Sequence, residues 1–273
     1  MKHGLPRPTV DHLLCSRGVI QTSECPYAVE MTVTRPLADG KSAKASPNLG
    51  SVGSALRADG LAQIEWPTDR AFEGLADQLG IVVRSQRRLE PKTRVEAHPA
   101  SLSADHGRGR FPWHTDGAQE TQPPRWLLMR VLTPTHTPTH FLDAMALLES
   151  SYMEEAVTRG AWSVSGGPHT FYAPVRSPIS GRLRWNQDLM KPASRLAREV
   201  EHLWTLTLGQ VEYVEHDWRL GRVLIVDNTR WLHARPAVSL NDNARQLERI
   251  LADNSRSSRL GLGGPGQQSH PLL

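Results

Sequence analysis

Short apolar runs recur along the chain and predict a protein built mainly of β-strands. Residues 125–132 (RWLLMRVL) and 222–228 (RVLIVDN) are nearly continuous apolar runs of strand length, which is typical of strands buried on both faces. Residues 27–34 (YAVEMTVT) instead alternate apolar and polar positions, which predicts a strand with one buried face. We interpret 211–218 (VEYVEHDW) and 245–253 (RQLERILAD) as further strands.

Three segments have apolar residues at helical spacing. The first is 67–80 (PTDRAFEGLADQLG), where Thr68 is expected to cap the helix and Gly80 to end it. The second is 195–204 (RLAREVEHLW), and a third, less regular pattern runs through 141–157. The chain therefore combines a majority of strands with a few helices.

Turn-forming residues divide the chain into three parts. Residues 1–54 hold the N-terminal strand and a Pro/Gly/Ser/Lys-rich loop (36–54) that is expected to be flexible. Residues 55–254 are expected to form one domain, because β-rich barrels and sandwiches of ~200–250 residues are often single domains. Within it, 161–192 lacks a clear period and predicts a lid with short strands. Residues 255–273 lack a core pattern and are expected to be disordered.

Composition narrows the classes of function. The formal net charge is only +4 and the basic residues are scattered, so nucleic-acid binding is not expected. The two cysteines, Cys15 and Cys25, form neither a disulfide framework nor a CxxC zinc pattern, which favours a reduced, cytoplasmic protein. No apolar run approaches the ~18–20 residues of a membrane span, and the N-terminus has no signal-peptide apolar region. We therefore expect no membrane association.

Candidate chemistry first appears in the stretch FPWHTDGA (111–118), where His114 and Asp116 are two residues apart. In an extended backbone, residues i and i+2 point to the same face. The pair could bind a metal or form a structural hydrogen bond, and the motif alone does not decide. His233 follows a buried strand in DNTRWLH. If it meets His114 and Asp116, two imidazoles and one carboxylate form the facial ligand set of non-haem Fe(II) oxygenases.

The order of these residues resembles the taurine dioxygenase / clavaminate synthase-like superfamily of Fe(II)- and 2-oxoglutarate-dependent oxygenases. The resemblance covers about residues 55–252 and rests on His114-x-Asp116, on His233 after W-x2-G-x2-L-x-VDN, and on Arg245 and Arg249. It implies a mainly β fold with flanking helices and a double-stranded β-helix core (a jelly roll, cupin-like). It also implies Fe(II), 2-oxoglutarate and O2 as cofactor and cosubstrates, with release of succinate and CO2.

The resemblance assigns roles to individual residues. His114, Asp116 and His233 match the iron ligands of the family. Arg245, twelve residues after the distal histidine, matches the arginine that pairs with the distal carboxylate of 2-oxoglutarate. A guanidinium suits this role because it binds a carboxylate through two parallel hydrogen bonds and stays charged. Arg249 is a candidate for contact with either the cosubstrate or the substrate.

The chain departs from the family pattern in two places. Thr139 matches a threonine that contacts 2-oxoglutarate, but Thr137 and Pro138 replace the two glycines that precede it in the family. Residues 233–235 read HAR where the family often has HGR. The first departure weakens the assignment of Thr139 to cosubstrate binding, and the second is a mild one.

Substrate recognition is expected in the loop before His114 and in the segment 170–192. Arginines in these segments suggest an anionic group on the substrate, and an aspartate suggests an amine. Several of the arginines are equally expected to face solvent. The candidate substrate-binding residues are Arg108, Arg110, Arg182, Arg184 and Asp188.

The resulting hypothesis is a dioxygenase that oxidises an unactivated C–H bond of a small polar molecule. Hydroxylation of an amino acid or of an amino-acid-derived natural-product intermediate is the favoured reaction, and desaturation or cyclisation is the alternative. A non-catalytic metal-binding jelly roll is a further alternative, as is hydrolysis by Zn²⁺, which would leave Arg245 without a role. The small molecule is the only partner expected, with homo-oligomer formation left open.

Overall fold

The computed structural model describes residues 35–36, 49–99, 101–148 and 151–255. The strand predicted at 27–34, most of the predicted loop at 36–54, and the predicted tail beyond residue 255 lie outside the described residues.

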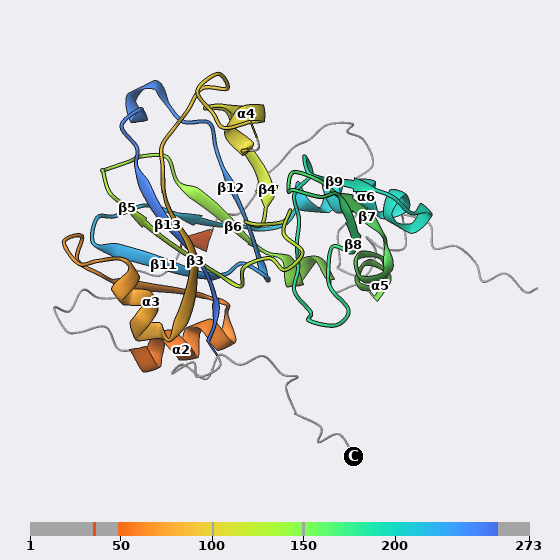
Figure 1. Cartoon of the computed structure of the whole chain (residues 1–273), viewed down its shortest axis with the longest axis horizontal. Helices are drawn as coiled ribbons and strands as arrows, with labels where there is room; N and C mark the ends of the chain where they lie inside the picture. The colour runs from red at the N-terminus through yellow and green to blue at the C-terminus, as the bar shows by residue number, and fades with distance from the viewer. Residues whose placement is uncertain (1–34, 37–48, 100, 149–150, 256–273) are drawn as a thin grey trace, which may run out of the picture.

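Two five-stranded sheets face each other and form the core of the molecule (Figure 1). In the first sheet, only β1 and β10 pair in parallel, and the other neighbours are antiparallel. In sheet order, its strands are β1 (Arg35–Pro36), β10 (Val214–His216), β6 (Thr139–Asp143), β12 (Trp231–Arg235) and β4 (Phe111–His114).

The second sheet is antiparallel throughout. In sheet order, its strands are β2 (Leu61–Glu65), β11 (Arg222–Asp227), β5 (Trp126–Val131), β13 (Leu247–Asn254) and β3 (Ile81–Leu89). Two sheets, antiparallel except for the β1–β10 pair, pack face to face and form the predicted jelly-roll core, so the mainly β fold is confirmed.

Burial on both faces explains the continuous apolar runs of the central strands. Successive residues of a strand point to opposite faces of its sheet. On β5, Leu127 packs between the two sheets, and Leu128 packs on the outer face beneath α2 (Leu49–Ala58) and α3 (Glu73–Leu79). Every position of β5 is therefore apolar or buried, as the sequence pattern indicated.

The helices on this outer face differ from the prediction in their starting points. Residues 49–58 form α2, so the predicted loop at 36–54 is wrong from residue 49 onwards, because Val52 and Leu56, four residues apart, place an apolar stripe against the sheet. The predicted cap at Thr68 is wrong: the chain turns at 67–70, where the Arg70 N–H donates to the Pro67 carbonyl, and α3 begins at Glu73. Its predicted end at Gly80 is confirmed, with φ of 66°.

A smaller lobe lies beside the two-sheet core (Figure 1). The segment predicted as a lid with short strands forms a three-stranded sheet of β8 (Phe171–Ala173), β7 (Trp162–Val164) and β9 (Met190–Pro192). It packs with α5 (Ser151–Arg159) and α6 (Arg195–Leu208) around a cluster of buried residues that also includes Trp113 of β4.

The two other predicted helices have different outcomes, and two short helical elements lie between strands. The helix predicted over 141–157 is interrupted, because β6 continues to Asp143 and a 3-10 turn, η2 (Ala144–Leu148), precedes α5. The helix predicted at 195–204 is confirmed as α6, which the Ser194 hydroxyl caps. α4 (Leu102–His106) and η3 (Leu240–Asp242) lie in connections between strands. None of the helices in the described part of the chain is both long and apolar enough to cross a membrane.

Candidate metal centre and cavity

Three predicted ligands converge where β4 ends beside β12. His233 on β12 is directly opposite His114 on β4, and residues that are paired in this way share one face of the sheet. Asp116 lies in the turn that follows β4. One donor atom from each of the three residues lies within 4.8 Å of the other two. The sheet register thus brings together residues that are more than a hundred positions apart.

Nearby backbone and amide groups orient two of these ligands. Nδ1 of His114 lies 2.8 Å from the Pro112 carbonyl, which leaves Nε2 free for a metal. The Asp116 N–H donates to Oδ1 of Asn228, and Nδ2 of Asn228 donates to the Asp116 carbonyl, both at 2.9 Å. Gly117 follows with φ of 69°, and a Cβ there would lie 2.5 Å from the Pro124 ring. Only glycine fits this turn.

The electrostatic environment favours the ionisation states that a metal requires. Burial lowers the pKa of His114, and burial together with His114 lowers the pKa of His233 to about 3. Burial alone would raise the pKa of Asp116, but Arg249 and the two histidines outweigh it, so that its pKa lies below the usual value. Metal ligands must be neutral imidazoles and charged carboxylates. These three side chains meet that condition at neutral pH.

Unpartnered polar atoms also fit a metal at this point. Oδ2 of Asp116 and Nδ1 of His233 are buried and accept or donate no hydrogen bond among the described residues. A buried polar group without a partner is costly, and coordination would satisfy the carboxylate oxygen. Oδ1 of Asp116 is held by Nη1 of Arg249 at 2.6 Å. Two imidazoles and one carboxylate fit Fe(II) with open coordination positions.

A cavity of about 990 Å³ opens onto the three ligands. The predicted cosubstrate residues Thr139, Arg245 and Arg249 all line it, and so does Asp188. The Thr139 hydroxyl accepts a hydrogen bond from the Trp218 indole at 3.1 Å. The metal ligands and the predicted cosubstrate residues therefore line the same cavity.

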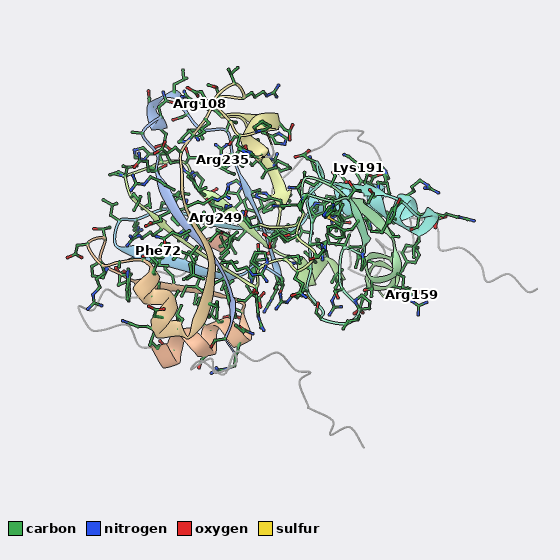
Figure 2. The ribbon with its side chains drawn as sticks, in the orientation of Figure 1. Phe72, Arg108, Arg159, Lys191, Arg235 and Arg249 are labelled. Atoms are coloured by element: carbon green, nitrogen blue, oxygen red, sulfur yellow. The ribbon has the colours of Figure 1, made fainter. Side chains whose placement is uncertain are left out.

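Two buried arginines present unused donors in this cavity. Nε and Nη2 of Arg245 and Nη1 of Arg235 have no hydrogen-bond partner in the described structure. Nη2 of Arg235 donates to the Gly109 carbonyl at 3.0 Å. Burial lowers the pKa of each guanidinium to about 10, so both stay charged at neutral pH. Figure 2 shows Arg235 and Arg249 within the sandwich. These charged, unpartnered donors favour the binding of an anionic ligand.

Arg182 and Arg184, which were predicted to contact the substrate, do not line this cavity. Arg184 donates to the backbone carbonyls of Ala118, Glu120 and Thr121. Arg182 donates to the Pro123 carbonyl at 3.0 Å. The carbonyl oxygens of the loop after Asp116 accept hydrogen bonds from these donors. In this structure both arginines therefore hold the backbone of that loop.

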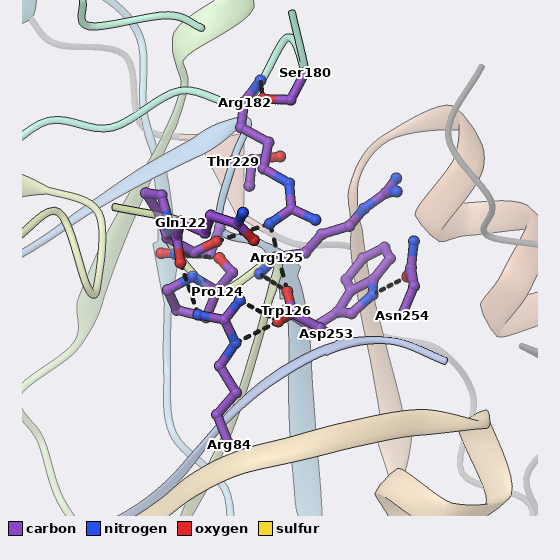
Figure 3. A network of polar contacts seen from close by, with 12 residues as sticks. Arg84, Gln122, Pro124, Arg125, Trp126, Ser180, Arg182, Thr229, Asp253 and Asn254 are labelled. Carbon is purple, nitrogen blue, oxygen red and sulfur yellow. Dashed lines mark hydrogen bonds and ion pairs between the residues drawn. The ribbon is translucent and has the colours of Figure 1, made fainter. Parts of the chain in front are cut away.

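A polar network fixes the other side of the same loop (Figure 3). Arg84 on β3 donates to the Gln122 carbonyl at 2.7 Å and forms an ion pair with Asp253 on β13. The Asp253 carboxylate in turn accepts the Arg125 N–H at 3.2 Å, and it lies 3.5 Å from Arg182. The loop that carries the carboxylate ligand is therefore anchored to the second sheet and to the smaller lobe.

The remaining predicted substrate residues are divided. Arg110 is exposed, and Arg108 donates to Asn243 at 2.8 Å; neither lines the cavity. Asp188 does line it, and its carboxylate lies 2.7 Å from Nε2 of His106 on α4. The two segments that were expected to recognise the substrate therefore contact each other beside the cavity.

Two residues of this site were missed by the sequence analysis. Arg235 lies two residues after His233 on the same strand, so the two-residue period of a strand already placed it on the ligand face. Asn228 follows the buried strand β11 and is fully buried. A polar residue at the end of an apolar run was its only signal in the sequence.

Comparisons with known proteins bear on the fold. No protein-family model matches the chain, and no curated protein matches it significantly. Among solved structures, an asparagine oxygenase in complex with Fe(II), 3-hydroxyasparagine and succinate has a TM-score of 0.58 at 16% identity, covering 74% of this chain and 78% of that one.

Two further structures are similar. The non-haem iron oxygenase OrfP, in complex with Fe and α-ketoglutaric acid, has a TM-score of 0.56 at 16% identity over 76% of this chain and 79% of its own. PvcB, an Fe, α-ketoglutarate-dependent oxygenase from an isonitrile synthetic pathway, has a TM-score of 0.54 at 18% identity over 76% and 80%. The chain therefore has the fold of the iron- and 2-oxoglutarate-dependent oxygenases, in agreement with the resemblance of its motifs.

Proposed function

We propose that this protein is an Fe(II)- and 2-oxoglutarate-dependent dioxygenase that hydroxylates a C–H bond of a small polar substrate. One observation carries the proposal: the His114, Asp116 and His233 cluster and the unpartnered guanidinium of Arg245 line the same cavity. A metal site without a cosubstrate would not require a buried, charged arginine beside it. A hydrolase or a non-catalytic metal protein leaves that arginine without a purpose.

Each residue has a defined task in this proposal. His114, Asp116 and His233 would hold Fe(II) and leave coordination positions open. The bound iron would supply the oxidation, in which one oxygen atom of O2 enters the succinate formed from 2-oxoglutarate with loss of CO2 and the other enters the hydroxyl group of the substrate. Arg245 binds the distal carboxylate of 2-oxoglutarate through its free donors. The Thr139 hydroxyl, which already accepts from Trp218, can donate its proton to the same carboxylate.

Arg249 controls the charge of the carboxylate ligand. Its contact with Oδ1 of Asp116 keeps that oxygen ionised and fixed, while Oδ2 is left for the metal. The three ligands are themselves buried, which limits the access of bulk water to a metal held between them. The chain thus supplies binding, orientation and exclusion of water, and the metal supplies the chemistry.

An amino acid or an amino-acid-derived intermediate is the proposed substrate. Two of the similar structures hold hydroxylated amino acids, 3-hydroxyasparagine in one and (3S)-hydroxy-L-Arg in another. Asp188 lines the cavity and can pair with the amine of such a substrate. The cytoplasmic location and the homo-oligomer of the sequence analysis stay predictions.

Succinate release tests the proposal. The purified protein is incubated with Fe(II), ascorbate and 2-oxoglutarate, with and without a panel of amino acids, and succinate is quantified. Anaerobic binding of 2-oxoglutarate to the Fe(II) protein is measured in parallel, since it requires no substrate. We expect metal-dependent binding and turnover, both absent in Asp116→Ala. A wild-type protein that binds Fe(II) but neither binds nor consumes 2-oxoglutarate would refute the proposal.

A further inference from the structure

One cavity wall is formed by strand β3 beside β13. The register places Arg87 of β3 directly opposite Arg249 of β13, and directly opposed residues of an antiparallel pair share one face. Because Arg249 reaches Asp116, that face is the cavity face. Ser85 and Leu89, two positions to either side of Arg87, line the cavity together with it.

Arg87 has no partner of its own. Among the described residues, its side chain forms no hydrogen bond or ion pair, and it is exposed at the cavity rim. Arg84 on the same strand, in contrast, is paired with Glu120 and Asp253. Like charges directly opposite each other in a sheet repel. Arg249 is already paired with Asp116, so Arg87 is the member of the pair that is open to a further anion.

The charges around the cavity leave Arg87 available. Asp116 is needed by the metal, and Asp188 contacts His106 through Oδ2 and is assigned above to the substrate amine through its other oxygen. Of the other carboxylates that line the cavity, Glu90 accepts from Gln246, Glu120 pairs with Arg84, and Asp105 is exposed on α4. A 2-oxoglutarate dianion would use the donors of the deeper arginine, Arg245. A second anion that enters on the β3 side would meet Arg87, with Arg88 and Lys92 also at the rim.

We propose that Arg87 binds an oxyanion of the substrate, a carboxylate in the case of an amino acid, and so selects acids over their neutral derivatives. The inference rests on the proposed function and specifies its substrate class. It moves anion recognition from the arginines at 182 and 184, which hold backbone carbonyls, to the wall of β3. The substrate anion would lie across the β3–β13 pair, on the face that also carries the contact to Asp116.

Sulfate is the probe for this site, because it is an oxyanion that needs no knowledge of the substrate. The anaerobic protein is loaded with Fe(II) and saturating 2-oxoglutarate, and sulfate is titrated calorimetrically at constant ionic strength. We expect Arg87→Gln to weaken sulfate binding roughly tenfold, as expected when a hydrogen bond to a charged group is lost. Arg87→Lys should retain most of the affinity. Arg198→Gln, the same charge change at an exposed position on α6, should match the wild type.

Two results would overturn the inference: a wild-type protein that binds no sulfate, or an Arg87→Gln protein that binds it as tightly as the wild type. The affinity for 2-oxoglutarate, measured in the loading step, separates the two proposals. If the wild type does not bind 2-oxoglutarate, the proposed function fails. If 2-oxoglutarate binds equally to the wild type and to Arg87→Gln while sulfate does not discriminate between them, only the role of Arg87 fails.

Discussion

Replacing Asn228 by alanine is expected to weaken metal binding, although Asn228 is not a ligand. Its amide forms two hydrogen bonds to the backbone of Asp116 and a third to the Pro124 carbonyl, all at 2.9 Å. The side chain is fully buried. It therefore closes the turn that carries the carboxylate ligand and holds the ligand at a fixed distance from His233.

The hydrogen bonds set the size of the effect. Each contributes about 1 kcal/mol net, and a buried group left without a partner costs about 1–3 kcal/mol. The loss of three such bonds should lower the free energy of unfolding by about 3 kcal/mol. Because the turn then no longer fixes the carboxylate, metal affinity should fall by about 10–100-fold, as is usual when a group that orients a metal ligand is removed.

Two measurements separate positioning from stability. Urea denaturation of the metal-free protein gives the free energy of unfolding, and anaerobic Fe(II) titration, under conditions where the variant is folded, gives the metal affinity. The control is Asn241→Ala, which removes an exposed amide in η3 and should change neither value. If Asn228→Ala is destabilised but binds Fe(II) with wild-type affinity, the turn does not position the ligand and this reasoning is wrong.

Three further predictions concern the site and the fold. Alanine at any one of the three metal ligands should abolish stoichiometric Fe(II) binding and turnover while the far-UV spectrum is retained; full activity in one variant would exclude that residue as a ligand. Arg245→Gln should reduce 2-oxoglutarate affinity by about 100-fold or more, because breaking a buried charge pair costs about 3–5 kcal/mol, with Fe(II) affinity preserved; if Arg249→Gln alone has this effect, the assignment is wrong. Burial lowers the pKa of His216 to about 4, so only the unfolded chain takes up this proton below pH ~6.5. Stability should therefore fall as the pH drops from about 6.5 towards 4, by up to about 3 kcal/mol, and His216→Gln should lack this part of the pH dependence in urea titrations.

The β core could be predicted because its strands are short and strongly apolar. The apolar runs at 125–132 and 222–228 form β5 and β11, and both faces of these strands are buried. Residues 49–58 were misread because glycine and serine hide the apolar stripe of Val52 and Leu56. The local composition resembled a loop, and packing against the outer face of the sheet made the segment a helix.

The roles of the arginines near the site could not be predicted from residue type alone. A guanidinium binds a substrate carboxylate and a row of backbone carbonyls with the same donors, so an arginine in a loop near a site carries no mark of its use. Arg184 meets three carbonyls and is thereby occupied. Arg245 keeps two donors free in the cavity, and Arg87 faces that cavity only because β3 pairs with β13 in one register. Shifting that register by one residue would turn Arg87 to the opposite face. The specificity of the proposed enzyme therefore depends on strand pairing that no local sequence pattern encodes.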